Sequence, residues 1–381
     1  MARRPTGLPL TTSCAGSPSM RSLFLACLVV LASTPAAWPV QPPPVEASSY
    51  VLLEAQTGQV LASHRPHEPR PPASTTKILT ALLVLERLRL DDVVVASRRA
   101  SLQREGSSIG FEVGERRTVR ELLYALLVKS ANDAAVVLAE AVDGTVERFV
   151  ARMNRRAQAL GARHTHFTNP HGLYDPGHVT TAYDLALIAR AAMQNPTFRQ
   201  IVRTQVYEYM GLEGPMRLVN GNRLLGRYPG ADGIKTGWTV ESGRCLVASA
   251  TRNGRRLVAV LLNAPQVFQD AARLLDYGFG AFELRTFVRR GEVMERLDLS
   301  DGVIVSAVAS RDLVASVSRL ARTDLRVVYR PDLRPPIKAG EVIGRAEVWA
   351  DGRRLGQVAL LAGETVPAIS WPPFLRWLYR R

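Results

Sequence analysis

The run of residues from Lys77 to Leu90 constrains this chain more than any other segment, because it is apolar nearly all the way round a helix. A helix without a polar face has to be buried on every side, so this run predicts a helix at the centre of a domain. The sequence Ser74-Thr75-Thr76-Lys77 stands at its start. Residues three apart share one face of a helix, so the Lys77 amine should reach the Ser74 hydroxyl. A lysine in that place, next to a helix N-terminus, is one way to activate a serine as a nucleophile.

The segments on either side of this helix predict an α+β domain. Strand-like runs flank the turns Gln56-Thr57-Gly58 and Arg252-Asn253-Gly254, which are hairpin signals. The order is strand hairpin, several helices, strand hairpin, so we expect one antiparallel sheet covered by helices. Helices are expected at 118–129 (with a Thr118-x-x-Glu121 capping box), at 145–160, at 181–194 with Thr181 as N-cap, and at 271–277.

From about Leu284 the pattern changes to short alternating strands, for example at 302–305, 325–329 and 346–349, with a turn at Asp351-Gly352. We expect a small all-β domain without clustered His, Cys or acidic residues, and therefore without chemistry of its own. The predicted organisation is a signal peptide at 1–37, a spacer at 38–49, a catalytic domain at 50–283, the β-rich domain at 284–368 and an amphipathic tail at 369–381.

Both ends of the chain carry targeting signals. Arg21 precedes the apolar run 23–31, and small residues follow as far as Ala37, which is typical of a secretory signal peptide cleaved near that residue. The start of translation is open between Met1 and Met20. The last thirteen residues combine aromatic rings with arginines, which favours the membrane interface. Docking of this segment on the β domain is the alternative.

Charge and cysteine content narrow the partners. The net charge of +15 attracts polyanions. The arginines are scattered and no nucleic-acid motif is present, so a generally basic surface is a better interpretation than nucleic-acid binding. Loss of the signal peptide would leave Cys245 as the only cysteine, so the mature protein could form no intramolecular disulfide. We expect Cys245 to be a small buried residue in a strand.

Two more short motifs follow the first in sequence. Ser130-Ala131-Asn132 comes directly after the predicted helix that ends near Lys129, and Lys235-Thr236-Gly237 leads into the second hairpin. Each has an ordinary alternative: Ser74 as a helix N-cap, the Ser130 segment as a helix stop, Gly237 as a turn residue. Chance does not readily produce all three in this order and in these contexts.

The sequence therefore resembles the penicillin-recognising serine enzymes. Three further segments, 167–173 (FTNPHGL), 181–185 (TAYDL) and 232–239 (DGIKTGWT), are similar to those of the D-alanyl-D-alanine carboxypeptidases, the low-molecular-weight penicillin-binding proteins. This resemblance covers about Tyr50 to Phe282. More loosely, the β-rich domain and the tail match that family's second domain and membrane anchor. The resemblance implies a β-lactamase/transpeptidase-like fold.

The resemblance also implies a function and a set of roles. The substrate is the peptidoglycan stem peptide, β-lactam antibiotics bind covalently, no cofactor or metal is needed, and the enzyme works at the extracytoplasmic face of the cell membrane. The catalytic residues are Ser74 as nucleophile, Lys77 as base and Ser130 as proton relay. The substrate-binding residues are Asn132 for the peptide backbone, Lys235 and Thr236 for the terminal carboxylate, and Gly237, which lets the strand pass close to the substrate. The backbone N–H groups of Trp238 and Ser74 form the oxyanion hole.

Some features depart from the family pattern. The strand ending at 261–265 is followed by Gln266-Val267-Phe268, without the arginine that many relatives carry there, so the sequence does not predict that auxiliary contact to the carboxylate. Trp238 is a bulky residue beside the expected active site, where it could narrow the range of substrates that the enzyme accepts. Three other functions stay open: a serine β-lactamase, for which no E-x-x-L-N loop is found between Ser130 and Lys235, a D,D-endopeptidase, and an inactive wall-binding scaffold. His164-x-His166 could be a fragment of a metal site, but His171 and His178 follow it at no recognised ligand spacing, so a metal site is not expected.

Overall fold

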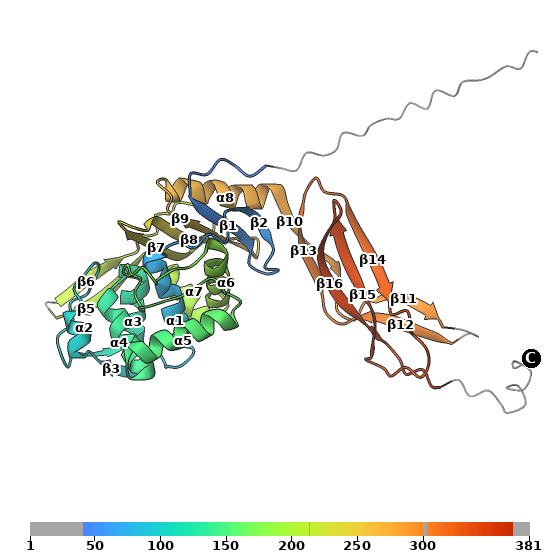
Figure 1. Ribbon diagram of the computed structural model, residues 1–381, viewed down its shortest axis with the longest axis horizontal. Helices are drawn as coiled ribbons and strands as arrows, with labels where there is room; N and C mark the ends of the chain where they lie inside the picture. Colours follow the sequence, from blue (N-terminus) through green and yellow to red (C-terminus); the bar gives the residue numbers. More distant parts are fainter. Residues whose placement is uncertain (1–40, 213, 300–302, 369–381) are drawn as a thin grey trace, which may run out of the picture. The chain divides into compact units, whose positions relative to one another are not determined.

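The computed structural model describes residues 41–212, 214–299 and 303–368, so the predicted signal peptide and tail lie outside the described residues. The first part of the chain is built on a five-stranded antiparallel sheet in the order β2-β1-β9-β8-β7 (Figure 1). Both predicted hairpins are present in this sheet. Its strands are β1 (Ser49–Glu54), β2 (Val60–His64), β7 (Ala231–Thr239), β8 (Gly243–Arg252) and β9 (Arg255–Leu262).

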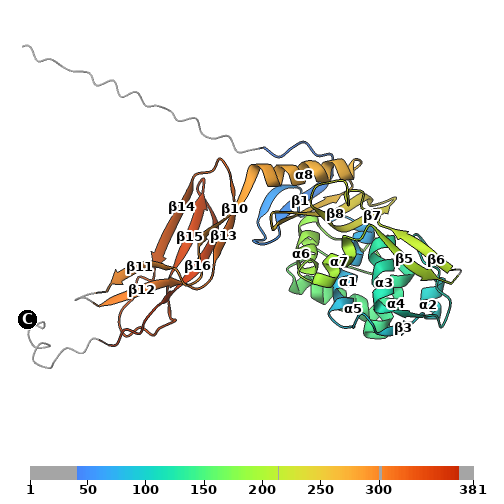
Figure 2. The ribbon, with the colours of Figure 1, turned by 180° about the vertical axis from the view of Figure 1, so that it is seen from behind.

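Both faces of this sheet are buried, and alternate residues of each strand serve alternate faces. In β9, Val258 and Val260 belong to one hydrophobic cluster while Leu257 and Ala259 belong to the other. Helix α8 (Val267–Ala281) covers the second face (Figure 2). The helix predicted at 271–277 is present, and it is longer than expected at both ends. The other helices pack with the first face, which confirms an antiparallel sheet covered by helices.

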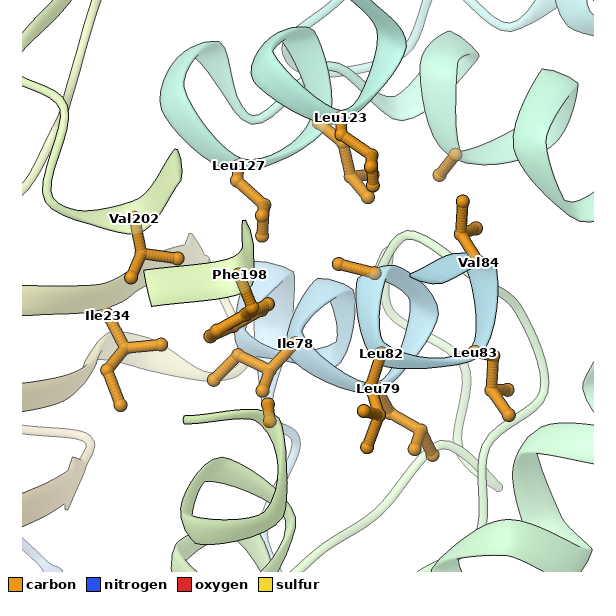
Figure 3. Close-up of a cluster of buried hydrophobic side chains, with 14 of the residues drawn as sticks. Ile78, Leu79, Leu82, Leu83, Val84, Leu123, Leu127, Phe198, Val202 and Ile234 are labelled. Atoms are coloured by element: carbon orange, nitrogen blue, oxygen red, sulfur yellow. The ribbon is translucent and has the colours of Figure 1, made fainter. Parts of the chain in front are cut away.

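Helix α1 (Lys77–Leu85) is central, as its apolar sequence predicts, and its first eight residues are buried. The expectation that it continues to Leu90 is wrong. Glu86 and Arg87 are charged and exposed, so the chain turns to the surface there. Figure 3 shows the apolar shell around α1, which consists of Leu123, Leu127, Phe198, Val202 and Ile234.

Three of the remaining helices begin where their capping residues predict. The Thr118–Glu121 capping box is formed, and the Thr145 and Thr181 side chains accept hydrogen bonds from Arg148 N and Asp184 N. The 118–129 helix ends as a π-helical turn (Ala125–Lys129). The helices are α2 (Arg98–Leu102), α3 (Val119–Tyr124), α4 (Asn132–Asp143), α5 (Val146–Ala159), α6 (Ala182–Ala192) and α7 (Pro196–Val202).

The second part of the chain is all-β and has its own apolar core. It contains a two-stranded sheet, β10-β13, and a five-stranded sheet in the order β11-β12-β16-β15-β14. The predicted turn at Asp351-Gly352 joins β15 to β16. The strands are β10 (Phe282–Val288), β11 (Val293–Asp298), β12 (Ile304–Ala309), β13 (Leu313–Ser318), β14 (Thr323–Tyr329), β15 (Val342–Ala350) and β16 (Arg353–Ala362).

Two small two-stranded sheets in the first part are not anticipated from the sequence. They are β3 (Val93–Val95) with β4 (Arg116–Thr118), and β5 (Val206–Gly211) with β6 (Gly214–Val219). Val93, Val95, Val206 and Val219 are exposed, so neither sheet has the clean apolar and polar alternation that identifies a half-buried strand.

Candidate active site

Ser74 lies in a 3₁₀ turn (Ala73–Thr76) that leads directly into α1. It is not a helix cap, because the turn is preceded by Pro72 and the cap position of α1 is Thr76, with no side-chain cap bond at either. The N-cap alternative for Ser74 is therefore wrong. The preceding residue, Ala73, has a positive φ of 49°. Few non-glycine residues adopt this conformation, and it turns the chain sharply just before the serine.

The Lys77 side chain is completely buried and its amine has three polar neighbours. Its Nζ lies 2.9 Å from Ser74 Oγ, 2.6 Å from Asn132 Oδ1 and 2.6 Å from the carbonyl oxygen of His171. The predicted approach of Lys77 to Ser74 is thus observed. Asn132 is brought to the same amine from 55 residues further along the chain.

These three neighbours are not equivalent, because a carbonyl or amide oxygen only accepts hydrogen bonds whereas a hydroxyl also donates. Asn132 Nδ2 donates to Glu105 O at 2.8 Å, which orients the Asn132 amide with its oxygen toward Lys77. A neutral amine has two N–H groups and one lone pair. If the N–H groups bond to the Asn132 and His171 oxygens, the lone pair is left for the Ser74 hydroxyl. The neutral form of Lys77 is therefore matched to accept a proton from Ser74.

Electrostatics favour that neutral form. Burial and the nearby charge of Lys235 lower the pKa of Lys77 well below its ordinary value, while Asp133 opposes them. Asp133 is itself buried, and its carboxylate accepts hydrogen bonds from the backbone N–H groups of Ile109, Gly110 and Ala134. Burial is the largest effect on Asp133 and raises its pKa.

The Ser130 segment follows the π-helical turn. Ser130 is in the left-handed conformation with φ 72°, and Asn132 is the first residue of α4. The helix-stop alternative correctly describes this backbone, since Ser130 ends one helix and α4 begins two residues later. With this geometry, Ser130 and Asn132 line the cavity that contains Ser74.

The third motif lies on β7. Lys235 is buried, its Nζ donates to Thr236 O at 2.9 Å, and burial lowers its pKa to about 7. Gly237 of the same strand packs closely against the segment that carries Ser74. A Cβ at this position would lie 3.0 Å from both the Ser74 nitrogen and the Ala73 Cβ, so the glycine lets β7 pass close to the nucleophile's own backbone.

Six of the eight candidate residues line one cavity of about 930 Å³: Ser74, Ser130, Asn132, Thr236, Gly237 and Trp238. Lys77 and Lys235 lie buried beside it. The Trp238 side chain is 64% exposed on the cavity wall. Cys245 also lines the cavity, and it is a buried residue of β8 as expected.

The loop that contains His171 and Gly172 completes the site in a way that sequence reasoning missed. The His171 carbonyl, rather than its ring, contacts Lys77. Gly172 has φ +89°, and a Cβ there would collide with the carbonyl of Ala73. The glycine between His and Leu in the segment 167–173 was the only signal for this close approach.

His178 is a second residue that the sequence did not single out. Its Nδ1 accepts a hydrogen bond from Thr168 N at 3.0 Å, so its Nε2 carries the hydrogen and donates to Thr76 Oγ1 at 2.8 Å. Thr76 Oγ1 in turn donates to Ala73 O at 2.9 Å. This chain of bonds fixes the turn that holds Ser74. His178 is buried, which lowers its pKa to about 4 and keeps it neutral at pH 7.

Within the described ranges, no three His, Cys, Asp or Glu side chains could hold a metal ion together. Nor does any helix of those ranges have the length and apolar character needed to cross a membrane.

Comparison with known proteins agrees with this arrangement. Residues 36–266 match the family model for D-alanyl-D-alanine carboxypeptidase, and residues 282–368 match the C-terminal domain of penicillin-binding protein 5. The chain belongs to the D-alanyl-D-alanine carboxypeptidase family. The resemblance to this family, predicted from the motifs, is confirmed.

Relatives support the assignment along most of the chain. The D-alanyl-D-alanine carboxypeptidase DacF of Bacillus subtilis is 32% identical over 345 residues, which is 87% of this chain and 88% of that protein. DacB2 of Mycobacterium tuberculosis is 42% identical over 61% of this chain and 82% of its own length. The crystal structure of penicillin-binding protein 5 from Haemophilus influenzae superposes with a TM-score of 0.78 at 28% identity, covering 86% of this chain and 99% of the other. The two-part fold predicted from the sequence is confirmed by this neighbour.

Proposed function

We propose that this protein is a serine-type D-Ala-D-Ala carboxypeptidase that removes the terminal D-alanine from peptidoglycan stem peptides through an acyl-enzyme on Ser74. The observation that supports it most strongly is the environment of Lys77. When this amine is neutral, the Asn132 and His171 oxygens, which can only accept hydrogen bonds, take up both of its N–H groups and leave its lone pair for Ser74 Oγ at 2.9 Å. The amine is thereby positioned as a general base.

In the first half of the reaction Ser74 Oγ attacks the carbonyl between the two D-alanines and its proton passes to Lys77. Lys235 and Thr236 hold the terminal carboxylate, and the backbone N–H groups of Ser74 and Trp238 stabilise the oxyanion. The close packing of Gly237 against the Ser74 backbone supports this pairing of donors, because it brings β7 next to the 3₁₀ turn that carries Ser74. Ser130 relays a proton to the departing amine.

In the second half the C–N bond has broken, D-alanine has left, and the acyl group is esterified to Ser74. Lys77 then takes a proton from water, which attacks the ester and releases the shortened peptide. A β-lactam enters the same first step. Its ring amide opens on Ser74, but the leaving nitrogen stays tethered to the acyl group, so the adduct persists.

Mass spectrometry of the purified protein after brief exposure to penicillin tests the nucleophile, together with an assay of D-alanine release from diacetyl-L-Lys-D-Ala-D-Ala. We expect one stable adduct on Ser74 and release of D-alanine. The Ser74→Ala variant should lose both and keep the fold. Labelling of that variant would refute the assignment of Ser74.

The same assays separate the other functions. Rapid turnover of penicillin without D-alanine release would indicate a β-lactamase, and the absence of both activities would indicate a wall-binding scaffold. Family membership and the intact Ser74, Lys77, Asn132 cluster favour the carboxypeptidase over both.

We further propose that the protein is exported and acts at the extracytoplasmic face of the membrane, with the segment 369–381 on the lipid surface. The sequence of residues 21–37 and the aromatic and arginine content of the tail support this. Deletion of residues 369–381 should release the protein from anionic vesicles in a sedimentation assay. Unchanged sedimentation would refute the anchor.

A further inference from the structure

The cavity that contains Ser74 has an acidic residue on its wall, Glu105, that the proposed mechanism does not use. Glu105 is exposed, and among the described residues no lysine, arginine or histidine forms an ion pair with its carboxylate. A carboxylate binds an ammonium group through charge-assisted hydrogen bonds. The negative charge of Glu105 is therefore available to a cationic group of the substrate.

The backbone of Glu105 is held beside Asn132. Asn132 Nδ2 donates a hydrogen bond to Glu105 O at 2.8 Å, and Asn132 N donates to Ser107 O at 2.7 Å. Ser107 Oγ in turn donates to Lys129 O at 2.8 Å. These three bonds fix the segment 105–107 to the start of α4. Glu105 thus has a defined place in the cavity, although its side chain is exposed.

The place of Glu105 along the substrate follows from Asn132. In the proposed function Thr236 receives the carboxylate of the leaving D-alanine, and Asn132 binds the peptide backbone. A leaving D-alanine has no further backbone, so the backbone at Asn132 belongs to the acyl part of the substrate. A peptide advances by about 3.5 Å per residue. The residue that precedes the two D-alanines therefore lies next to the segment 105–107.

The charges on the cavity wall are distributed in the same direction. Four charged side chains line the cavity: Glu105, Glu241, Arg223 and Arg244. Arg223 lies near the carboxylate end, because it follows Gly221, where an added Cβ would be 3.0 Å from Thr236 Oγ1. The two arginines also line a smaller neighbouring cavity, which the two acids do not. Positive charge thus gathers at the carboxylate end, and Glu105 gives the acyl end a negative charge.

An apolar surface lies beside Glu105. A Cβ on Gly106 would be 3.7 Å from Leu173 Cδ2, and both Leu173 and Tyr174 line the cavity. Tyr174 is 48% exposed, so its ring is accessible to a ligand. The Leu173 carbonyl accepts a hydrogen bond from Asn169 Nδ2 at 3.0 Å, which fixes this part of the wall. An apolar strip that ends at a carboxylate is complementary to an alkyl chain that ends in an ammonium group.

We propose that Glu105 binds the ammonium group on the side chain of the residue that precedes the two D-alanines. The enzyme then prefers stem peptides in which this amine is free over those in which it is acylated. This inference rests on the proposed function and leaves the chemistry at Ser74 unchanged. Glu105 contacts the substrate away from the reacting atoms, so it determines specificity and takes no part in bond making or breaking.

The test compares three substrates that differ only at the side-chain amine: Nα-acetyl-L-Lys-D-Ala-D-Ala with a free amine, the same peptide acetylated at Nε, and the same peptide succinylated at Nε, which carries a carboxylate. They are assayed with the wild type, Glu105→Gln and Glu105→Lys. Glu112→Gln is the matched control, because Glu112 is an exposed acid of the same loop that lies outside the cavity and has no ion pair in the described part of the chain.

We expect kcat/KM of the wild type for the free amine to be about fivefold higher than for the acetylated peptide, as for one favourable exposed ion pair. Glu105→Gln should abolish this preference by lowering kcat/KM for the free amine, with changes within about twofold for the other two substrates. Glu105→Lys should reverse the order, so that the succinylated peptide is cleaved faster than the free amine. Glu112→Gln should behave like the wild type. The preference should shrink at high salt.

Three results would overturn the inference: equal cleavage of the free and acetylated peptides by the wild type, an equal effect of Glu105→Gln on both, or a loss of the same size in Glu112→Gln. Penicillin lacks this side chain, so its labelling of Ser74 is measured in the same preparations as a test of the nucleophile. If Ser74 is labelled while the enzyme ignores the amine, the inference about Glu105 fails and the proposed function stands. If wild-type Ser74 is not labelled, the proposed function itself fails.

Discussion

Replacement of Gly172 by alanine should displace the turn that carries the nucleophile Ser74, although Ser74 itself is unchanged. Gly172 has φ +89°, and its added Cβ would collide with the carbonyl oxygen and carbon of Ala73 and lie 2.9 Å from Thr76 Oγ1. Two costs follow. The left-handed backbone conformation costs an alanine about 1 kcal/mol, and forcing a methyl group into packed backbone costs about 1–3 kcal/mol more. We expect Gly172→Ala to lower the free energy of unfolding by about 2–4 kcal/mol.

Acylation should be slowed as well. Relief of the collision requires the 3₁₀ turn to move by about 1 Å, because the colliding atoms belong to backbone that cannot rotate away. That turn carries Ser74, and a displacement of this size at a reacting atom costs about 10²-fold in rate. Stopped-flow or mass-spectrometric measurement of penicillin acylation should therefore show a loss of about 10²-fold, in protein that is still folded by circular dichroism.

Gly144→Ala is the matched control. Gly144 ends α4 with φ +78°, and an added Cβ meets no atom within 4 Å. It carries the backbone cost alone, so we expect a loss of about 1 kcal/mol and an unchanged acylation rate. Wild-type acylation by Gly172→Ala would refute the reasoning, as would an equal loss in Gly144→Ala.

Three further predictions concern the buried polar groups. Because the folded-state pKa of Lys235 is about 7 and an unfolded lysine titrates near 10.4, the unfolded chain binds more protons between these values. The free energy of unfolding should rise with pH across that window, and Lys235→Met should flatten the rise in thermal melts taken in a pH series. His178→Leu leaves Thr168 N without an acceptor and Thr76 Oγ1 without a donor, so chemical denaturation should show a loss of about 2–4 kcal/mol; a loss below about 1 kcal/mol would argue against this hydrogen-bond chain. Asp133→Asn replaces one of two accepting oxygens with an NH₂ group that faces backbone donors, so hydrogen exchange at 109–110 should accelerate, and unchanged exchange would contradict the role given to Asp133.

The features of this site that could be predicted from the sequence are those that depend on local geometry. Ser74 and Lys77 are three residues apart in a helical segment, and their contact at 2.9 Å follows from helix periodicity alone. The caps at Thr118, Thr145 and Thr181 are equally local and are all formed. The burial of α1 follows from its apolar composition. Its end at Leu85 could also be predicted, because the charged residues Glu86 and Arg87 come next.

What the sequence could not predict depends on contacts between distant segments or on backbone atoms. The contact of Asn132 with Lys77 joins residues from different helices, and nothing in the Ser130-Ala131-Asn132 motif specifies that its amide oxygen faces an amine. The His171 carbonyl carries no side-chain signature at all. The glycines show the intermediate case: Gly237 could be predicted to permit a close approach, but not that the backbone of Ser74 is one of its neighbours.

The contacts that were hardest to predict are also the ones that decide the chemistry. If Lys77 contacted only Ser74, its amine could be charged or neutral with equal consistency. The Asn132 and His171 oxygens alone do not remove that ambiguity either, because an ammonium could donate to all three neighbours. The ambiguity is removed by burial and by the charge of Lys235, which lower the pKa of Lys77, since these favour the form with only two N–H groups. With two N–H groups and two obligate acceptors, the remaining lone pair has one neighbour, Ser74 Oγ. The base is thus defined by the residues around the Ser-x-x-Lys motif more than by the motif itself.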